Sequence, residues 1–250
     1  MKRILLFLSA LFIATTAIAH TINWYVDDSV YYTTTCESGE NVTPPTAPEK
    51  YGYTFRGWQD VTPVEYIEST GTQYIDTGIQ QSDYAQNLIV TATLQFTTLN
   101  DIQYSMGTTI TSVMYFMPLV ARNSLFDSNI GAPASDIKTQ ASDTNIHTII
   151  CDSVNGSLQI DNNLYIYASN NAMINYNIYL FAINEAGKPI RQSYIRFYNI
   201  SFSTKEGTLI RDFIPVLDKD GTPCMYDKVE RKFYYNAGTG DFIAGPIVGE

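Results

Sequence analysis

The chain has 250 residues, a formal net charge of −10 and charged side chains at only 16% of its positions. This acidic balance argues against binding to nucleic acid, which requires basic patches that offset the phosphate charges. The 19 tyrosines and 12 phenylalanines favour half-buried β-strands, because aromatic side chains pack well on a pleated surface.

The first 19 residues have the pattern of a secretory signal peptide. Lys2 and Arg3 precede an apolar run over residues 4–13, and Ala17-Ile18-Ala19 supplies the small residues of a cleavage site. The run is too short to span a membrane comfortably. We therefore predict cleavage after Ala19 and a secreted protein without a membrane span, located outside the cell, on its surface or in the periplasm.

Residues 20–61 predict a small β module. Apolar and polar side chains alternate over 22–27, residues 31–35 are again β-prone, and a short strand is expected over 53–58. Prolines interrupt regular structure between the last two segments. About 40 residues provide only a small hydrophobic core, so this module is expected to pack against the neighbouring domain or to be part of a repeat array.

The end of this module carries the motif Pro48-x-x-Tyr51-Gly52-Tyr53-Thr54-Phe55-x-Gly57-Trp58. This motif resembles the Listeria–Bacteroides repeat of internalin B type. The resemblance covers roughly residues 22–59 and implies a β-grasp-like extracellular module. Members of that family usually occur in tandem on surface proteins, whereas this sequence contains a single copy.

Residues 62–245 predict a second domain of many short strands, followed by a tail over 246–250. Asn155-Gly156 is a strong hairpin signal, and Pro118 predicts a strand edge or a bulge. Turns separate the strands and no convincing helical pattern interrupts them, so the sequence predicts an all-β sandwich or jelly roll. The expected strands cover residues 64–67, 73–76, 88–96, 113–120, 147–152, 158–161, 177–183, 193–203 and 209–216.

Three stretches of this domain resemble concanavalin A-like, laminin-G-like jelly-roll modules. Residues 64–78 are similar to the opening strand pair of that superfamily, and residues 147–161 to its strand–hairpin–strand unit, with Asn162-Asn163 where Asp-Gly is expected. Residues 200–227 are similar to its closing stretch. The resemblance implies a concanavalin A-like jelly roll over about 63–245. Relatives bind glycans or proteins, hydrolyse polysaccharides, or have no known activity.

Catalytic constellations are not evident in the sequence. Glycoside hydrolysis needs two carboxylates across a cleft, but Glu65 and Glu68 are expected on opposite sides of a strand as solvated edge residues. His147 and Cys151 would lie about 13 Å apart along a strand, so we interpret His147 as structural and Cys151 as a buried thiol. The chain is therefore predicted not to be an enzyme, with a divergent glycoside hydrolase kept as an alternative.

Polar aromatic side chains on the later strands are the candidate ligand contacts. Tyr165 and Tyr167 are expected on one strand face, and Asn177 and Tyr179 on another. Sugar-binding sandwiches stack pyranose rings on exposed Tyr or Trp and bind hydroxyl groups through Asn and Asp, although core packing is the alternative for each tyrosine. The sequence thus favours an adhesin-like module that binds a glycan or a surface protein. A structural or assembly module without a small ligand is the alternative.

No cofactor is predicted. Asp218 and Asp220 precede a turn glycine and are a candidate calcium site, for which a polar β-turn is the alternative interpretation. An oxidising compartment would permit one disulfide. The sequence leaves open whether Cys36 and Cys224 form it.

Overall fold

The structure is a computed structural model that describes residues 19–26, 29–37, 40–51, 55, 58, 60–84, 87–111, 114–122, 124–131, 134–167 and 173–248. The chain divides into two compact units, Met1–Gln59 and Asp60–Glu250. Apart from Ala19, the predicted signal peptide lies outside the described residues, as does most of the strand predicted over 53–58. Both stay predictions.

The first unit contains an antiparallel hairpin of β1 (Ala19–Val26) and β2 (Ser29–Glu37). The alternation of β1 directs Trp24 to one face, where its ring centroid lies 5.1 Å from that of Trp58. The Phe55 ring packs against Trp58 at 5.2 Å. These rings supply apolar contact area that a unit of this size has few other ways to obtain.

The second unit consists of two large sheets, whose strand pairs are antiparallel except for β8 with β16. Its described residues include one short 3-10 helix, η1 (Gln81–Tyr84). No described helix combines the length and the apolar composition of a membrane span. Among the described residues the first sheet has nine strands: β5 (Ile75–Gln80), β7 (Gln103–Tyr104), β8 (Met106–Thr111), β9 (Met114–Arg122), β10 (Leu125–Gly131), β11 (Ala134–Ala141), β15 (Asn177–Leu180), β16 (Ile183–Glu185) and β17 (Lys188–Ile190).

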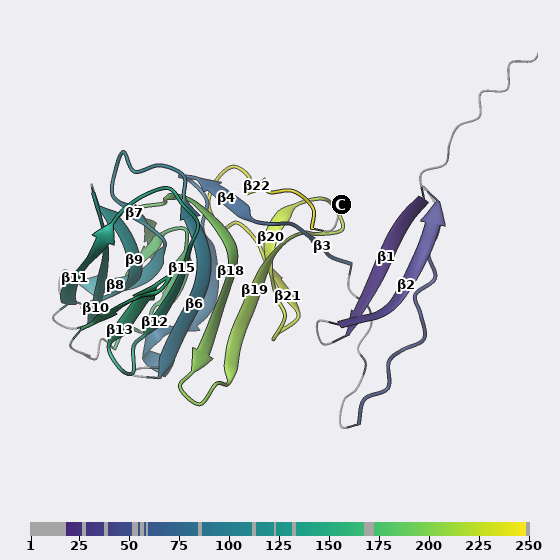
Figure 1. Ribbon diagram of the computed structural model, residues 1–250, viewed down its shortest axis with the longest axis horizontal. Coiled ribbons are helices and arrows are strands. Elements are labelled where there is room, and N and C mark those ends of the chain that lie inside the picture. The colour runs from purple at the N-terminus through teal and green to yellow at the C-terminus, as the bar shows by residue number, and fades with distance from the viewer. Residues whose placement is uncertain are drawn as a thin grey trace, which may run out of the picture. The chain divides into compact units, whose positions relative to one another are not determined.

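The second sheet has eleven strands among the described residues: β3 (Thr62–Pro63), β4 (Ile67–Thr70), β6 (Leu88–Phe96), β12 (His147–Asp152), β13 (Ser157–Ile160), β14 (Asn163–Ile166), β18 (Tyr194–Thr204), β19 (Leu209–Leu217), β20 (Pro223–Asp227), β21 (Lys232–Tyr234) and β22 (Ile243–Ala244). The long strands β6, β18 and β19 run side by side in it (Figure 1).

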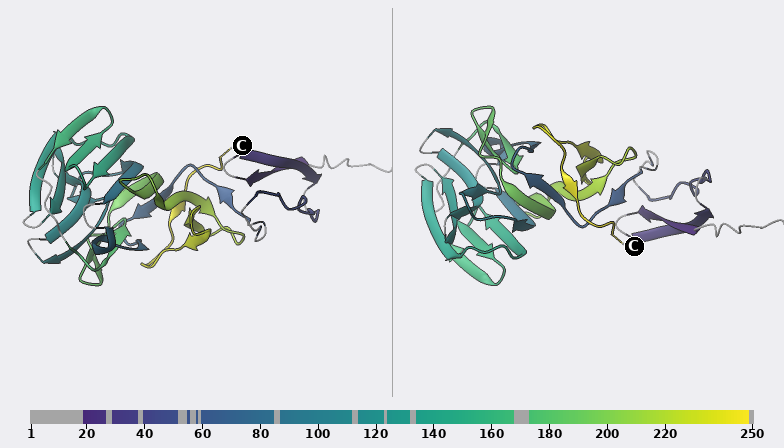
Figure 2. Two further views of the ribbon diagram at one scale, coloured as in Figure 1. Left: turned by 90° about the horizontal axis from the view of Figure 1, so that it is seen from below. Right: turned by 90° about the horizontal axis from the view of Figure 1, so that it is seen from above.

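The two sheets pack face to face around one apolar core. Strand β6 alternates strictly between buried and half-buried residues, so one of its faces enters the core. Phe96 of β6 packs against Phe126 of β10, with ring centroids 5.8 Å apart. The unit is thus an all-β sandwich, as the sequence predicted, and Figure 2 views its layers from two opposite sides.

Several local predictions are confirmed in detail. Strands β6 and β12 have the predicted bounds, and β12 pairs with β13 across the predicted hairpin. Pro118 lies at a register shift, because Asp127 pairs with Val120 but Asn129 pairs with Met117. A proline cannot donate a ladder hydrogen bond, and a bulge is one of the few places within a sheet that tolerates it.

The segment predicted as a C-terminal tail is bound to the sheet as far as the structure describes it. Ile247 forms a bridge with Val64, and the Val248 amide donates to the Pro63 carbonyl at 2.9 Å. Just before them, β22 pairs with β4 (Figure 1). These backbone hydrogen bonds make residues up to 248 part of the sandwich.

Candidate functional site

A hollow of about 480 Å³ lies between parts of the two sheets in the second unit. Strands β5 and β15 of the nine-stranded sheet form one side, and β19 and the β21 region of the eleven-stranded sheet form the other. Concave sites with a few well-placed polar groups are the usual places for small ligands. The polar side chains that line this hollow include Asp76, Asn177, Arg211, Glu230, Lys232 and Tyr235.

Asp76 and Asn177 form a hydrogen-bonded pair on one wall. Asp76 Oδ1 accepts from Asn177 Nδ2 at 2.8 Å and from the Gly78 amide at 2.9 Å. Within the described part of the chain, Asp76 Oδ2 and Asn177 Oδ1 have no hydrogen-bond partner. Two acceptor oxygens are therefore open to a ligand that donates hydrogen bonds.

The positive charge of Arg211 is offset within the opposite wall. Its guanidinium lies 3.5 Å from the carboxylate of the fully buried Asp227 and 2.8 Å from Glu230 Oε1. Glu230 Oε2 accepts from the Tyr234 hydroxyl at 2.7 Å. Burial and this hydrogen bond raise the pKa of Tyr234 to about 12, so its hydroxyl stays a donor at neutral pH. These ion pairs and the hydrogen bond link Arg211, Asp227, Glu230 and Tyr234 into one network and stiffen the wall.

Tyr235 presents an aromatic ring at the edge of the hollow. The residue is 46% exposed, and its hydroxyl donates to Asp218 Oδ2 at 3.0 Å. This bond holds the ring in place while part of the ring stays accessible. The hollow thus combines open acceptor oxygens with an exposed aromatic surface, two features that suit a ligand with hydroxyl groups and an apolar ring face.

The structure places one of the four predicted ligand contacts, Asn177, in this hollow. Tyr179 is 7% exposed and stacks on Tyr74 with ring centroids 4.8 Å apart. Burial and the nearby charge of Asp76 raise the pKa of Tyr179. Tyr74 covers its ring on the face of β15 that points away from the core, so the buried ring offers no platform to a ligand in this structure.

The other two predicted tyrosines also point away from solvent. Tyr167 is 7% exposed and donates to the Asp152 carbonyl at 3.2 Å, and the half-buried Tyr165 donates to Gln140 at 3.3 Å. The exposed apolar side chains of β14 are instead Leu164 and Ile166, at 60% and 70%. The tyrosines occupy the inner face because their hydroxyl groups find acceptors there.

Asp218 and Asp220 lie in a polar β-turn. Asp218 Oδ1 accepts from the amides of Asp220 and Thr222, both at 2.9 Å, and these bonds hold the pKa of Asp218 below its usual value. The Asp220 carboxylate contacts Lys219 Nζ at 2.7 Å. The two carboxylates thus have partners within the turn and its neighbour Tyr235. In the part of the chain that the structure describes, no group of three or more His, Cys, Asp or Glu side chains is placed to hold a metal ion.

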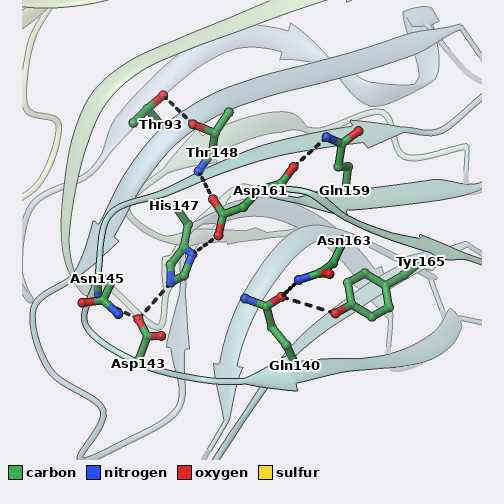
Figure 3. A network of polar contacts seen from close by, with 10 residues as sticks. All are labelled: Thr93, Gln140, Asp143, Asn145, His147, Thr148, Gln159, Asp161, Asn163 and Tyr165. Atoms are coloured by element: carbon green, nitrogen blue, oxygen red, sulfur yellow. Dashed lines mark hydrogen bonds and ion pairs between the residues drawn. The ribbon is translucent and has the colours of Figure 1, made fainter.

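His147 lies between two carboxylates at the start of β12 (Figure 3). Its Nδ1 is 2.7 Å from Asp161 Oδ2 and its Nε2 is 2.9 Å from Asp143 Oδ1. Burial alone would lower the pKa of His147, but the hydrogen bonds and charges of the two aspartates outweigh it and raise that pKa. The residue is 4% exposed, which fits the structural role that the sequence indicated.

The three cysteines are free thiols. Cys151 is buried in β12, where its sulfur lies 3.9 Å from the Tyr167 hydroxyl. Burial raises the pKa of Cys151 to about 12, and that of Cys224 likewise to about 12. Neither thiol is a nucleophile at neutral pH, because the thiolate is the reactive form.

Sequence reasoning missed Asp76, Arg211 and Tyr235 as site residues. Asp76 lies in a predicted strand and Tyr235 in an aromatic stretch, but neither position carries a local motif for binding. The Asp76–Asn177 bond joins residues 101 positions apart. No local spacing pattern in the sequence reports such a contact.

The fold and the hollow define an all-β sandwich with an open polar site, and comparison with known proteins adds no family to this description. No family model matches the chain, and no curated protein matches it. Among solved structures, a proposed carbohydrate binding protein from Bacteroides ovatus is similar at 12% sequence identity with a TM-score of 0.46. The match covers 75% of this chain and 61% of that one. A likeness of this degree identifies neither a family nor a ligand.

Proposed function

We propose that this protein is a secreted, non-catalytic module that binds carbohydrate, and that the hollow beside Asp76 and Asn177 holds the sugar. One observation carries the proposal. Open acceptor oxygens on Asp76 and Asn177 share a preformed hollow with the exposed ring of Tyr235. A sugar donates hydrogen bonds from its hydroxyl groups and presents an apolar C–H face to an aromatic ring.

The charges around the hollow favour a neutral ligand. Asp76 and Glu230 contribute two negative charges, and Arg211 and Lys232 contribute two positive charges. Arg211 is already paired with Glu230 and Asp227. A strongly anionic or cationic ligand would find little net attraction, because the positive and negative side chains that line the hollow are equal in number.

The sequence patterns support the same assignment. The signal-peptide pattern over residues 1–19 supports a location outside the cytoplasm, where an adhesin-like module meets glycans. From the resemblances described above, we also propose a concanavalin A-like jelly-roll topology for about 63–245 and a β-grasp-like repeat module for 22–59. Both modules belong to extracellular proteins in the families that they resemble.

A glycan array followed by calorimetry tests the proposal on the chain without its signal peptide. We expect at least one neutral glycan to bind, and Asp76→Ala and Asn177→Ala to weaken that binding at least tenfold, about 1.4 kcal/mol. Asn155→Ala is the matched control, because Asn155 Nδ2 donates to Asp152 at 2.7 Å on an exposed turn outside the hollow. An array without any bound glycan, or equal affinities for all three variants, would contradict the proposal.

Hydrolysis of a glycan is a second candidate, because Asp76 and Glu230 line the same hollow and glycosidases use two carboxylates. Binding is favoured over hydrolysis because both oxygens of Glu230 are already engaged: Oε1 forms an ion pair with Arg211 and Oε2 accepts from the Tyr234 hydroxyl. Release of reducing ends from a bound glycan separates the two functions. Release that Asp76→Asn and Glu230→Gln each abolish would establish hydrolysis.

A further inference from the structure

A second, smaller hollow of about 220 Å³ adjoins the first. It is lined by residues after β19 and after β21, among them Thr222, Asp241 and Phe242. Tyr235 is the one residue that lines both hollows. The exposed ring thus stands between two concave sites rather than at the edge of one.

The ring of Tyr235 is fixed from the side of the Asp218 turn. Its hydroxyl donates to Asp218 Oδ2 at 3.0 Å, and the other oxygen of Asp218 is held by the amides of Asp220 and Thr222. The Phe233 ring lies 6.0 Å from it. A ring that is held in place before a ligand arrives loses little conformational entropy on binding.

The wall of the second hollow is also preformed. The segment after Tyr235 is tied to the turn before β5, because the Thr239 amide donates to the Thr72 carbonyl at 3.1 Å and Gln73 Nε2 donates to the Asp241 carbonyl at 2.9 Å. Asn236 Oδ1 accepts hydrogen bonds from the backbone amides of Tyr74 and Gly238. The backbone is therefore held, while the exposed carboxylate of Asp241 has no hydrogen-bond partner among the described residues.

We infer that the site binds an oligosaccharide chain of at least two sugar residues, one in each hollow, with the Tyr235 ring between them. This inference rests on the proposed function and specifies its ligand. Asp76 and Asn177 accept hydrogen bonds from sugar hydroxyl groups in the first hollow, and the Asp241 carboxylate accepts them in the second. A single monosaccharide would use only part of the surface that the two hollows present.

Calorimetry with ladders of β-1,4-linked gluco-, manno- and xylo-oligosaccharides and of α-1,4-linked gluco-oligosaccharides, from one to six residues long, tests the inference. For the ladder that binds, we expect affinity to rise at least tenfold between the monosaccharide and the trisaccharide. Asp241→Ala should remove most of that rise and leave monosaccharide binding unchanged. Asp220→Ala, a change of an exposed carboxylate that lines neither hollow, should leave the whole ladder unchanged.

Changes at Tyr235 give a second readout. Tyr235→Ala should weaken the longer members of the ladder at least tenfold, whereas Tyr235→Phe keeps the ring, loses only the bond to Asp218 and should weaken them less. Binding that does not depend on length, or that Asp241→Ala leaves intact, would overturn the two-hollow site while the proposed function stands. Failure of every ladder to bind would also overturn the two-hollow site, whereas the glycan array decides the proposed function.

Discussion

The contacts of His147 predict a pH-dependent stability of the larger unit. Both ring nitrogens lie within 2.9 Å of carboxylate oxygens. A neutral imidazole carries one N–H and one lone pair, so it can donate to only one of the two aspartates. The geometry therefore fits the imidazolium, in agreement with the raised pKa of His147.

Asp161→Asn is the sharpest perturbation of this contact. Asp161 has a φ of 53°, a left-handed conformation that Asn tolerates, and the Asn carbonyl can still accept from the Thr148 amide as Asp161 does at 3.0 Å. The variant thus loses mainly a hydrogen bond between charged groups, which contributes about 1.5–3 kcal/mol. Because the Asp161 side chain is 41% exposed, solvent screening reduces this to about 1 kcal/mol. In a unit of this size, the melting temperature should fall by about 2–4 °C.

The sign of the pH dependence follows from the direction of the shift. The pKa of His147 is higher in the folded state than its unfolded value near 6.5. The stabilisation is therefore fully present below about pH 6.5, as long as the aspartates are ionised, and is lost as the pH rises through the folded pKa. The difference between the wild type and Asp161→Asn should be largest near pH 5.5 and should shrink at alkaline pH.

Urea denaturation at pH 5.5, 7 and 9 measures this difference. Asp212→Asn is the control, since Asp212 pairs with Lys228 at 2.9 Å and lysine does not titrate in this range. Its effect should be the same at the three pH values. An Asp161→Asn effect that is constant or grows with pH would refute the assignment of a charged His147.

Three further predictions follow from packing. Gly107→Ala should destabilise the sandwich by about 2 kcal/mol or more, because a Cβ at Gly107 would overlap the Phe116 carbonyl. Gly207→Ala is the control: Gly207 has a φ of 84° and nothing within 4 Å of the added Cβ, so the change should cost only about 1 kcal/mol. Equal losses of unfolding free energy in chemical denaturation would contradict the close approach at Gly107. Phe126→Ala should cost about 3–5 kcal/mol, since its ring is fully buried between Phe96 and His147, and a change under about 1 kcal/mol would show that the site can collapse. Under native conditions at pH 8, iodoacetamide should modify the partly exposed Cys36 well before the buried Cys151; mass spectrometry measures this, and equal rates would argue against the burial of Cys151.

Much of the fold could be predicted because it depends on a local pattern. The alternation of β6 gives one apolar face regardless of which strand lies beside it, and its bounds are those expected. The β12–β13 hairpin follows from a turn whose residues favour it. The bulge at Pro118 follows from the missing amide of proline.

The candidate site was predicted only in part. Alternation shows that two side chains share a face but not which face turns inward. Tyr165 of β14 and Tyr167 just after it turn inward, whereas Leu164 and Ile166 are exposed. A pattern of apolar residues would have placed these faces the other way round. Neighbouring strands and hydrogen-bond partners such as Gln140 for Tyr165 decide the orientation.

The sequence by itself determined the all-β class, the positions of strands such as β6, β12, β18 and β19, and the turn chemistry, because these depend on residues a few positions apart. The tertiary structure alone decided that Asp76, Asn177 and Tyr235 line one hollow, since strand order and register bring them together from β5, β15 and the end of β21. Such pairing depends on contacts across more than a hundred residues. A local periodicity carries no information about them.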